Sequence, residues 1–329
     1  MEQVTAALPA NEGSADIAPE AIAPARPKGM AASLVETTKP GITRLVTITS
    51  MVGFVMAGLS RGMPFSEMLG LGVVCMLGTA LSAAGANAVN QWMERDRDAL
   101  MPRTQRRPLP QGRVAPGAVL ATGVTLCITG VAVLLLAGPL PSLISLACIV
   151  SYVAFYTPMK TRSTLATFIG AIPGALPPLI GWTAASTGAG FSPMFEAGGL
   201  ALFSIMFIWQ IPHFMAIAWM YKEDYRTGGY LVLPVVDERG FWTALTVALW
   251  TLALIPATLF PARVWPELLG TPYIIIAGLS AVAFGAMAVR LIVARSRSAA
   301  RKVFFASIMH LPLILFAMVV EAVLRKALA

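Results

Sequence analysis

Residues 66–98 read SEMLGLGVVCMLGTALSAAGANAVNQWMERDRD, an apolar run that ends in a cluster of alternating charges. The apolar part is long enough to cross a lipid bilayer as a helix, which takes about 20 residues. If the helix continues through the charged part, Asn90, Glu94 and Asp98 follow one another at intervals of four and lie on one face. The stretch therefore predicts a transmembrane helix that carries a row of side-chain oxygens to the membrane boundary.

The rest of the chain has the same apolar character. Of its 329 residues, 57% are hydrophobic and 12% are charged, whereas a soluble domain carries about 25% charged residues. The composition excludes a soluble protein and predicts an all-α integral membrane protein, with one polytopic membrane domain over residues 31–329. We expect nine transmembrane helices at about 43–59, 66–92, 116–137, 139–157, 164–186, 198–221, 241–260, 272–293 and 304–324.

Residues 1–30 differ from this domain. They are rich in Ala, Pro and Glu and contain no long apolar run. A secretory signal needs a basic start and an apolar centre, and a mitochondrial presequence avoids acids, so neither fits. We expect a disordered N-terminal tail.

The net charge of +8 is explained by membrane topology. With a cytoplasmic N-terminus, the predicted loops place every basic residue on the cytoplasmic side except Arg61, Arg263, Arg325 and Lys326. This asymmetry is typical of membrane proteins, whose cytoplasmic loops are enriched in Lys and Arg. The charge therefore indicates orientation, and no nucleic-acid partner is expected.

The oxygen row predicts a bound cation. Carboxylates stacked along one helix face repel one another, so Glu94 and Asp98 call for a compensating positive charge. Oxygen ligands such as these and Asn90 favour Mg²⁺, which commonly shares its coordination with substrate phosphates. Asp96 lies on a different face and contributes only if the helix frays there.

The loop after this helix predicts an anionic substrate. Residues 94–113 carry six arginines against three acids, and Arg103 and Arg107 lie among them. A diphosphate would satisfy both this surplus and the cation. An ordinary solvated cytoplasmic loop explains the arginines but leaves the acids unexplained.

Two further polar clusters are expected at the same boundary. The helix at 139–157 is followed closely by Lys160, four residues after Tyr156. The helix at 198–221 is followed by Lys222 and Asp224, which are candidates for a phosphate contact and a second metal ligand. An ordinary charged helix end explains the second cluster equally well.

The only two histidines, His213 and His310, lie about 9 to 12 Å inside the cytoplasmic ends of their predicted helices. Intramembrane histidines face protein or a cavity because exposure to lipid is costly. Each therefore either binds a substrate or makes an interhelical hydrogen bond, and both interpretations stay open.

These segments resemble a known family. The spacing Asn90-x3-Glu94-x3-Asp98 is similar to the Asn-x3-Asp-x3-Asp signature of the UbiA superfamily of intramembrane prenyltransferases, with Glu in place of the first Asp. More narrowly, ERDRDALMPRT (94–104), RRPLP (106–110) and WQIPHF (209–214) resemble the protoheme IX farnesyltransferase, or haem O synthase, branch. Further similar segments are Lys39-Pro40, Tyr156-Thr157-Pro158-x-Lys160, GALPPLIGW (174–182) and Asp224-Tyr225, and together they extend over residues 37–312.

The resemblance implies a UbiA-type helix bundle in a bacterial plasma (inner) membrane, with an active chamber that opens to the cytoplasm. It implies farnesyl diphosphate and haem b as substrates, haem O and diphosphate as products, and Mg²⁺ as cofactor. Membrane lipid, and a haem A synthase or oxidase assembly factor, are the partners it suggests.

The same resemblance implies roles for individual residues. The expected metal ligands are Asn90, Glu94, Asp98 and Asp224. The expected phosphate contacts are Arg103, Arg107, Lys160 and Lys222. The expected further substrate contacts are Asp96, Tyr156, Gln210, His213, Tyr225 and His310.

Three alternatives remain open. Another UbiA-type prenyltransferase would act on a quinone precursor or a chlorin. A membrane transporter would share the helix count, but transporter sites usually lie near the bilayer midplane, whereas only Glu321 among the acids falls within a predicted span. A haem carrier without chemistry would leave the acidic row unexplained.

Overall fold

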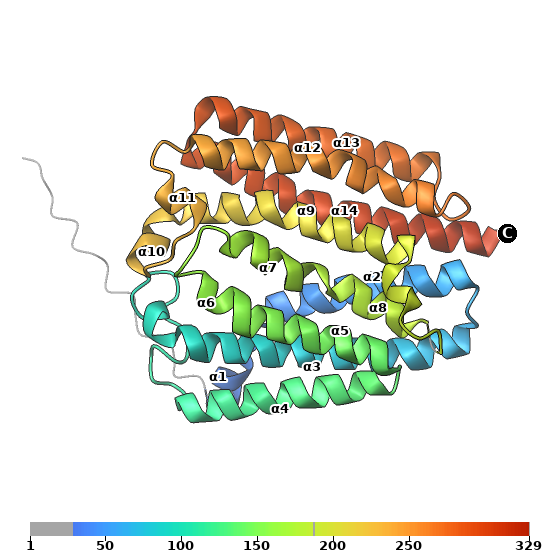
Figure 1. Ribbon diagram of the computed structural model, residues 1–329, viewed down its shortest axis with the longest axis horizontal. Coiled ribbons are helices and arrows are strands. Elements are labelled where there is room, and N and C mark those ends of the chain that lie inside the picture. Colours follow the sequence, from blue (N-terminus) through green and yellow to red (C-terminus); the bar gives the residue numbers. More distant parts are fainter. Residues whose placement is uncertain (1–28, 187, 329) are drawn as a thin grey trace, which may run out of the picture.

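The computed structural model describes residues 29–186 and 188–328. Within these ranges all regular structure is helical, which confirms the predicted all-α class. The long helices lie side by side, with their connecting loops gathered at the two ends of the bundle (Figure 1). The predicted tail lies outside the described residues except for Gly29 and Met30, and Met30 begins the short helix α1 (Met30–Thr37).

Eight helical segments in the described part of the chain are long and apolar enough to cross a membrane. They are α2 (Pro40–Arg61), α3 (Phe65–Asp98), α4 (Pro116–Leu135), α5–η1–α6 (Pro139–Met159), α9 (Ala197–Met220), α12 (Phe241–Val264), α13 (Thr271–Ala294) and α14 (Arg297–Leu328). Large apolar side chains such as Leu279 and Val293 are exposed on them, as contact with lipid requires. The chain is a multi-pass membrane protein.

The predicted span at 164–186 is where the structure departs from the nine-helix expectation. It consists of two short helices in tandem, α7 (Ala166–Ala175) and α8 (Pro177–Ala184). Pro177 has no N–H to donate to the carbonyl of Pro173, so the helical hydrogen bonds are interrupted there. The Cys148 thiol lies 3.1 Å from that carbonyl oxygen and donates to it instead. A ninth continuous span is therefore not confirmed.

The fourth span contains a widened turn. It is built from α5 (Pro139–Val150), the π-helix η1 (Ser151–Tyr156) and α6 (Thr157–Met159). The Thr157 hydroxyl donates to the carbonyl of Tyr152 at 2.8 Å and helps to close this turn. Single π-helical turns occur frequently at functional sites, and here the turn carries Tyr152 and Tyr156 to an internal cavity.

Glycines bring neighbouring helices into backbone contact. A Cβ added at Gly85 of α3 would lie 2.5 Å from the backbone nitrogen of Cys127 and 2.6 Å from the carbonyl oxygen of Gly123, both in α4. A Cβ at Gly181 of α8 would collide with the carbonyl oxygen of Ser50 in α2. Small residues favour such close packing of helices in membranes. These contacts pack α3 directly against α4 and α8 directly against α2.

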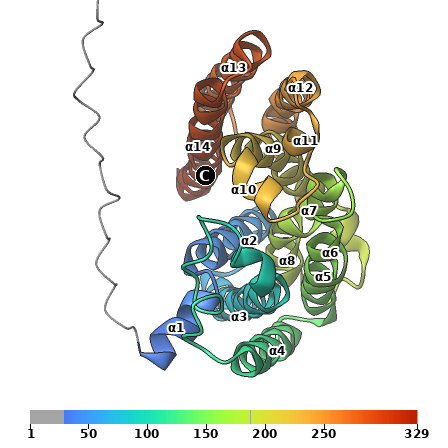
Figure 2. The ribbon, with the colours of Figure 1, turned by 90° about the vertical axis from the view of Figure 1, so that its left-hand side faces the viewer.

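One end of the bundle carries most of the charged loops. In Figure 1 this end lies at the left, with the loop after α3, the turn after α6, and the short helices α10 (Lys222–Thr227) and α11 (Leu233–Val236). Figure 2 views the bundle from this end. The C-terminus and the 3₁₀-helix η2 (Ser192–Phe195) lie at the opposite end. We call the first end the loop end.

Replacing Gly85 by Ala should destabilise the protein, because the added methyl group meets α4 backbone that cannot move aside. Overpacking of this kind costs about 1–3 kcal/mol. The measurement is the melting temperature of detergent-purified protein. The matched control is Gly70→Ala in the same helix, where no atom lies within 4 Å of the new Cβ; equal melting temperatures for the two variants would contradict the close α3–α4 packing.

Candidate active site

A cavity of about 420 Å³ extends from the loop end into the bundle, and we call it the chamber. At the loop end its walls are polar, formed by Lys39, Glu94, Asp98, Arg103, Arg107, Tyr156, Lys160, Tyr225 and Tyr230. Deeper in, they are small or apolar, and include Ala83, Ala86, Ile149, Pro173, Ile180 and Met206. The chamber therefore suits a ligand with a charged head and an apolar tail.

The predicted oxygen row lies at the polar end. Helix α3 continues to Asp98 without fraying, so Asn90, Glu94 and Asp98 share one face as expected. All three are buried, with exposed fractions of 0%, 6% and 1%. Asn90 is placed behind the wall, because only Glu94 and Asp98 line the chamber.

Each member of the row is paired with a cation from elsewhere in the chain. Lys160 donates to Glu94 at 2.7 Å. Arg107 donates to Asp98 at 2.6 Å. These pairs neutralise the two buried carboxylates of α3, which would be very costly to leave unpaired.

Lys39 is the third cation, and it holds Asn90. Its ammonium group donates to Oδ1 of Asn90 at 2.5 Å, while Nδ2 of Asn90 donates to the Thr157 hydroxyl at 3.0 Å. The backbone of Lys39 adopts φ 49°, a left-handed conformation that costs a side-chain-bearing residue about 1–2 kcal/mol. Burial, together with the charges of Arg107 and Lys160, lowers the pKa of Lys39 to about 7. Asn90 thus acts here as the residue that positions Lys39.

Lys160 has the opposite electrostatic character. Burial alone would lower its pKa, but the Glu94 carboxylate outweighs burial and holds the pKa well above the ordinary value. Its ammonium group also lies 4.5 Å from the centroid of the Tyr156 ring. Lys160 is therefore a permanent positive charge at the chamber wall.

Aromatic side chains connect two loops across the mouth of the chamber. The Arg103 guanidinium lies 5.4 Å from the Tyr221 ring and 5.9 Å from the Tyr225 ring. Arg97 donates to the carbonyl of Gly228 at 3.0 Å. These contacts join the loop after α3 to the α10 region, and Arg103 and Tyr225 both line the chamber.

Three predicted substrate or metal contacts lie outside the chamber wall. Because α3 remains helical, the carboxylate of Asp96 points away and is 83% exposed. Helix α10 presents Tyr225 to the chamber, and its neighbour Asp224 does not line it. Lys222 donates to the backbone carbonyl of Asp237 at 3.3 Å and is absent from the wall as well. The expected second metal-ligand set is not assembled.

His213 of α9 lines the chamber. Its Nδ1 lies 2.7 Å from the Ser307 hydroxyl, and its ring is stacked on Trp209 and Phe304 at centroid distances of 4.6 and 5.4 Å. Its Nε2 makes no hydrogen bond within the described residues. The ring is thus held rigidly with one nitrogen free.

Gln210, one turn earlier in α9, also lines the chamber. Its amide nitrogen donates to the carbonyls of Met206, at 2.8 Å, and Ala171, at 3.4 Å. The second bond joins α9 to α7, where Gly174 leaves the room that the Gln210 side chain needs.

His310 lies elsewhere. It is 1% exposed and does not line the chamber. Its Nδ1 lies 2.8 Å from the Ser280 hydroxyl, and its Nε2 lies 3.4 Å from the Thr258 hydroxyl. His310 therefore makes hydrogen bonds from α14 to α13 and α12, which is the second of the two roles expected for the histidines.

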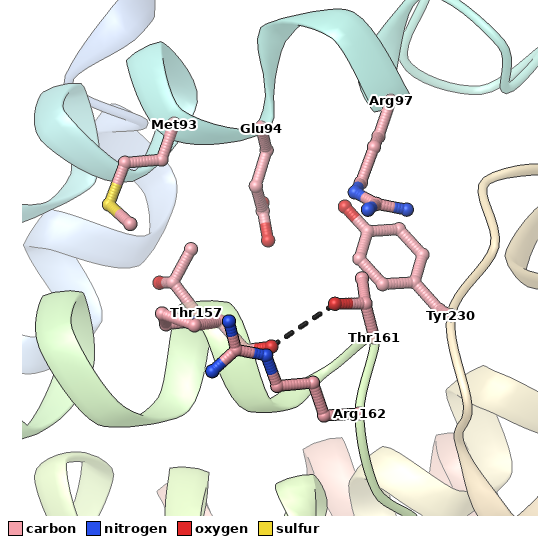
Figure 3. A pocket seen from close by; sticks show the side chains of 8 residues that line it. Met93, Glu94, Arg97, Thr157, Thr161, Arg162 and Tyr230 are labelled. Atoms are coloured by element: carbon pink, nitrogen blue, oxygen red, sulfur yellow. Dashed lines mark hydrogen bonds between the residues drawn. The ribbon is translucent and has the colours of Figure 1, made fainter.

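A second, smaller cavity of about 170 Å³ lies behind the polar end of the chamber, and we call it the side pocket. Figure 3 shows Glu94 and Arg97 reaching into it from α3, and Arg162 and Thr161 facing them from the turn after α6. Glu94 and Tyr230 line both cavities and thus form the partition between them.

Several site residues were not predicted as such from the sequence. Lys39 and Thr157 belong to segments that resemble the family but carry no predicted role, and Tyr152 and Tyr230 belong to no such segment. The signals available were Lys39-Pro40 directly before an apolar run and the aromatic spacing of Tyr152 and Tyr156. Tyr230 carries no local signal, because contacts with distant segments bring its loop to the site. The Leu231 N–H donates to the carbonyl of Lys160 at 2.8 Å, and Arg97 donates to the carbonyl of Gly228.

The donor set fits a divalent cation that is shared with a bound phosphate. Within the described residues, no group of three or more His, Cys, Asp and Glu side chains could hold a metal ion. Mg²⁺, however, is usually held by one or two carboxylates together with substrate phosphates and water. Glu94 and Asp98, adjacent along one wall, provide such a pair.

Known proteins match both the sequence and the fold. Residues 46–311 match the UbiA prenyltransferase family. The chain is 41% identical over 289 residues to a protoheme IX farnesyltransferase from Opitutus terrae, covering 87% of this chain and 93% of the relative.

Two solved structures share the fold. A structure of digeranylgeranylglyceryl phosphate synthase gives a TM-score of 0.72 at 16% identity, covering 89% of this chain and 99% of that one. A UbiA homologue from Archaeoglobus fulgidus, bound to GPP and Mg²⁺, gives a TM-score of 0.58 at 14% identity, covering 90% and 99%. This chain therefore belongs to the UbiA prenyltransferase family.

Proposed function

We propose that this prenyltransferase joins the farnesyl group of farnesyl diphosphate to the terminal carbon of a vinyl group of haem b, while one water molecule adds its hydroxyl to the neighbouring carbon and releases a proton, giving haem O and diphosphate. The observation that carries the proposal is the chamber, which is cationic at the loop end and apolar in its body. A prenyl diphosphate has the same division between a charged head and an apolar tail. The name of the Opitutus terrae relative supports the choice of farnesyl donor and haem acceptor.

In this proposal, the diphosphate binds at the polar end of the chamber. Lys160 and Arg107 would turn from Glu94 and Asp98 to the phosphate oxygens, and the carboxylates would then be free to hold Mg²⁺. The A. fulgidus homologue, whose structure contains GPP and Mg²⁺, supports this assignment. When bound, the cation supplies charge stabilisation for the departing diphosphate.

The cationic side chains at this end also stabilise the charge of the leaving diphosphate. As the C–O bond of the allylic diphosphate breaks, negative charge develops on the leaving group, and the fixed charges of Lys160, Arg103 and Arg107 stabilise it without any proton transfer. The apolar body of the chamber surrounds the prenyl chain and keeps water from the allylic cation.

Haem is proposed to bind beside His213. The free Nε2 of this residue is suited to contact or ligate the iron, because imidazole is a common axial ligand. The basic loop end is proposed to face the cytoplasm of a bacterial inner membrane, since Lys and Arg gather on that side of membrane proteins. Product delivery to a haem A synthase or oxidase assembly factor is part of the same proposal.

The acceptor is tested directly by mass spectrometry. Purified protein with farnesyl diphosphate and Mg²⁺ should add a farnesyl group to haem b and leave 4-hydroxybenzoate unchanged. Farnesylation of 4-hydroxybenzoate, with haem b untouched, would show instead a UbiA-type enzyme that acts on a quinone precursor.

Asp98→Asn should lower turnover by at least about a hundredfold, because removing one group that stabilises the transition-state charge costs about 2.7–4 kcal/mol. The matched control is Asp96→Asn, two residues away and exposed, which should retain wild-type turnover. Gel filtration and thermal melting establish that both variants fold. A fully active Asp98→Asn enzyme would exclude a role for this carboxylate in diphosphate activation.

The histidines provide a paired test of haem binding. His213→Ala should shift the Soret absorbance of bound haem and weaken its binding, because the free ring nitrogen is lost. His310→Ala should leave the spectrum unchanged and lower the melting temperature, since its ring bonds only to neighbouring hydroxyls. The opposite pattern would assign the iron contact to His310.

A further inference from the structure

The side pocket has no task in the reaction proposed above. We infer that it is a second anion-binding site, which receives the diphosphate product from the chamber and releases it to the aqueous side. This inference rests on the proposed function, because that reaction produces the diphosphate.

The lining of the pocket has the chemistry of an anion site. Arg97 and Arg162 both border it, and in Figure 3 they enter it from opposite sides, Arg97 from α3 and Arg162 from the turn after α6. Arg97 uses one NH group on the carbonyl of Gly228, which holds its side chain in place and leaves its other donors free. Arg162 makes no hydrogen bond or ion pair through its side chain within the described residues. Guanidinium groups are the preferred partners of phosphate oxygens.

Tyr230 lies where the two cavities meet. Its side chain is buried, with 3% exposed, and it lines both the chamber and the pocket. Its hydroxyl makes no hydrogen bond within the described residues. The hydroxyl can donate to an anion that passes the partition.

Glu94 makes the passage dependent on the state of the chamber. Its carboxylate lines both cavities, whereas Lys160, which donates to it at 2.7 Å, lines only the chamber. A bare carboxylate at the partition repels an anion, and a neutralised one does not. Passage is therefore favoured while a cation, either Lys160 or a bound metal, stays on Glu94.

The other flank of the chamber offers no comparable route. There α2 contributes Ile42 and Leu45, and α9 contributes Phe214 and Ile217. Moving a multiply charged anion past apolar side chains is costly because nothing replaces its lost hydration. This flank suits the apolar substrates, and the side pocket suits the charged product.

The first experiment compares the first turnover with later ones. Three full-length proteins are compared by rapid quench after mixing with farnesyl diphosphate, Mg²⁺ and haem b. They are the wild type, the double variant Arg97→Gln/Arg162→Gln and the control Arg106→Gln. Arg106 carries the same charge in the neighbouring loop and lines neither cavity. The double variant should complete its first turnover at the wild-type rate. Its later turnovers should be slower by about tenfold, the effect of losing one charge-assisted hydrogen bond, and the control should match wild type.

The charge-retaining variant Arg97→Lys/Arg162→Lys should recover most of the later rate. If the first and later turnovers of the Gln double variant fall together, or if neither falls, the exit role is overturned.

The second experiment does not depend on farnesyl transfer. Radiolabelled inorganic diphosphate is titrated onto the same proteins without donor or acceptor. Wild type and Arg106→Gln should show two classes of site, and the Gln double variant should lose one of them. If wild type fails to farnesylate haem b, the proposed function fails, and this titration still decides the pocket: a single class of site in wild type, or no change in the double variant, overturns it.

Discussion

Two buried ion pairs, Glu94–Lys160 and Asp98–Arg107, hold the loop end of the bundle together. They connect α3 to the turn after α6 and to the loop that follows α3 itself. Burying charge pairs yields little net stability, because the loss of hydration offsets the attraction. In the proposed function, these pairs keep the charges of the site satisfied until a charged ligand replaces one partner of each.

The packing of the other helices positions this polar end and shapes the chamber behind it. Gly85 and Gly181 bring helices into backbone contact, and the π-helical turn carries Tyr152 and Tyr156 to the chamber wall. The result is one continuous cavity with its charge concentrated at one end. That division of charge lets a membrane enzyme hold an amphiphilic donor without exposing its apolar tail to water.

Local sequence patterns predicted the part of the site that lies on a single helix. The spacing of Asn90, Glu94 and Asp98 requires one face of α3 because the helical period is fixed. Arg107 follows Asp98 in the next loop, but Lys160 and Lys39, which bind Glu94 and Asn90, come from distant segments. No periodicity of the sequence reports such pairing. The sequence also could not distinguish His213 from His310, because both lie at a similar depth in their predicted helices. In the structure His213 lines the chamber, whereas His310 binds Ser280 of a neighbouring helix.

The interruption of the predicted span at 164–186 has a different origin. Composition shows only that this segment is long and apolar. The helix breaks because Pro177 has no N–H to donate to the carbonyl of Pro173, and the Cys148 thiol donates to that carbonyl instead. Asp224 and Lys222 miss the chamber because they lie in the short helix α10. This helix turns Tyr225 toward the chamber, and Lys222 and Asp224 lie on its other faces.

The central claim is that the buried pairs open to admit a cation and a diphosphate. It is tested most directly by a structure of the protein with Mn²⁺ and a non-hydrolysable thio analogue of farnesyl diphosphate, with anomalous scattering used to locate the metal. The account predicts an anomalous peak in contact with Glu94 and Asp98, and Lys160 and Arg107 turned to the phosphate oxygens. A metal located elsewhere, with both ion pairs intact beside the bound analogue, would contradict it.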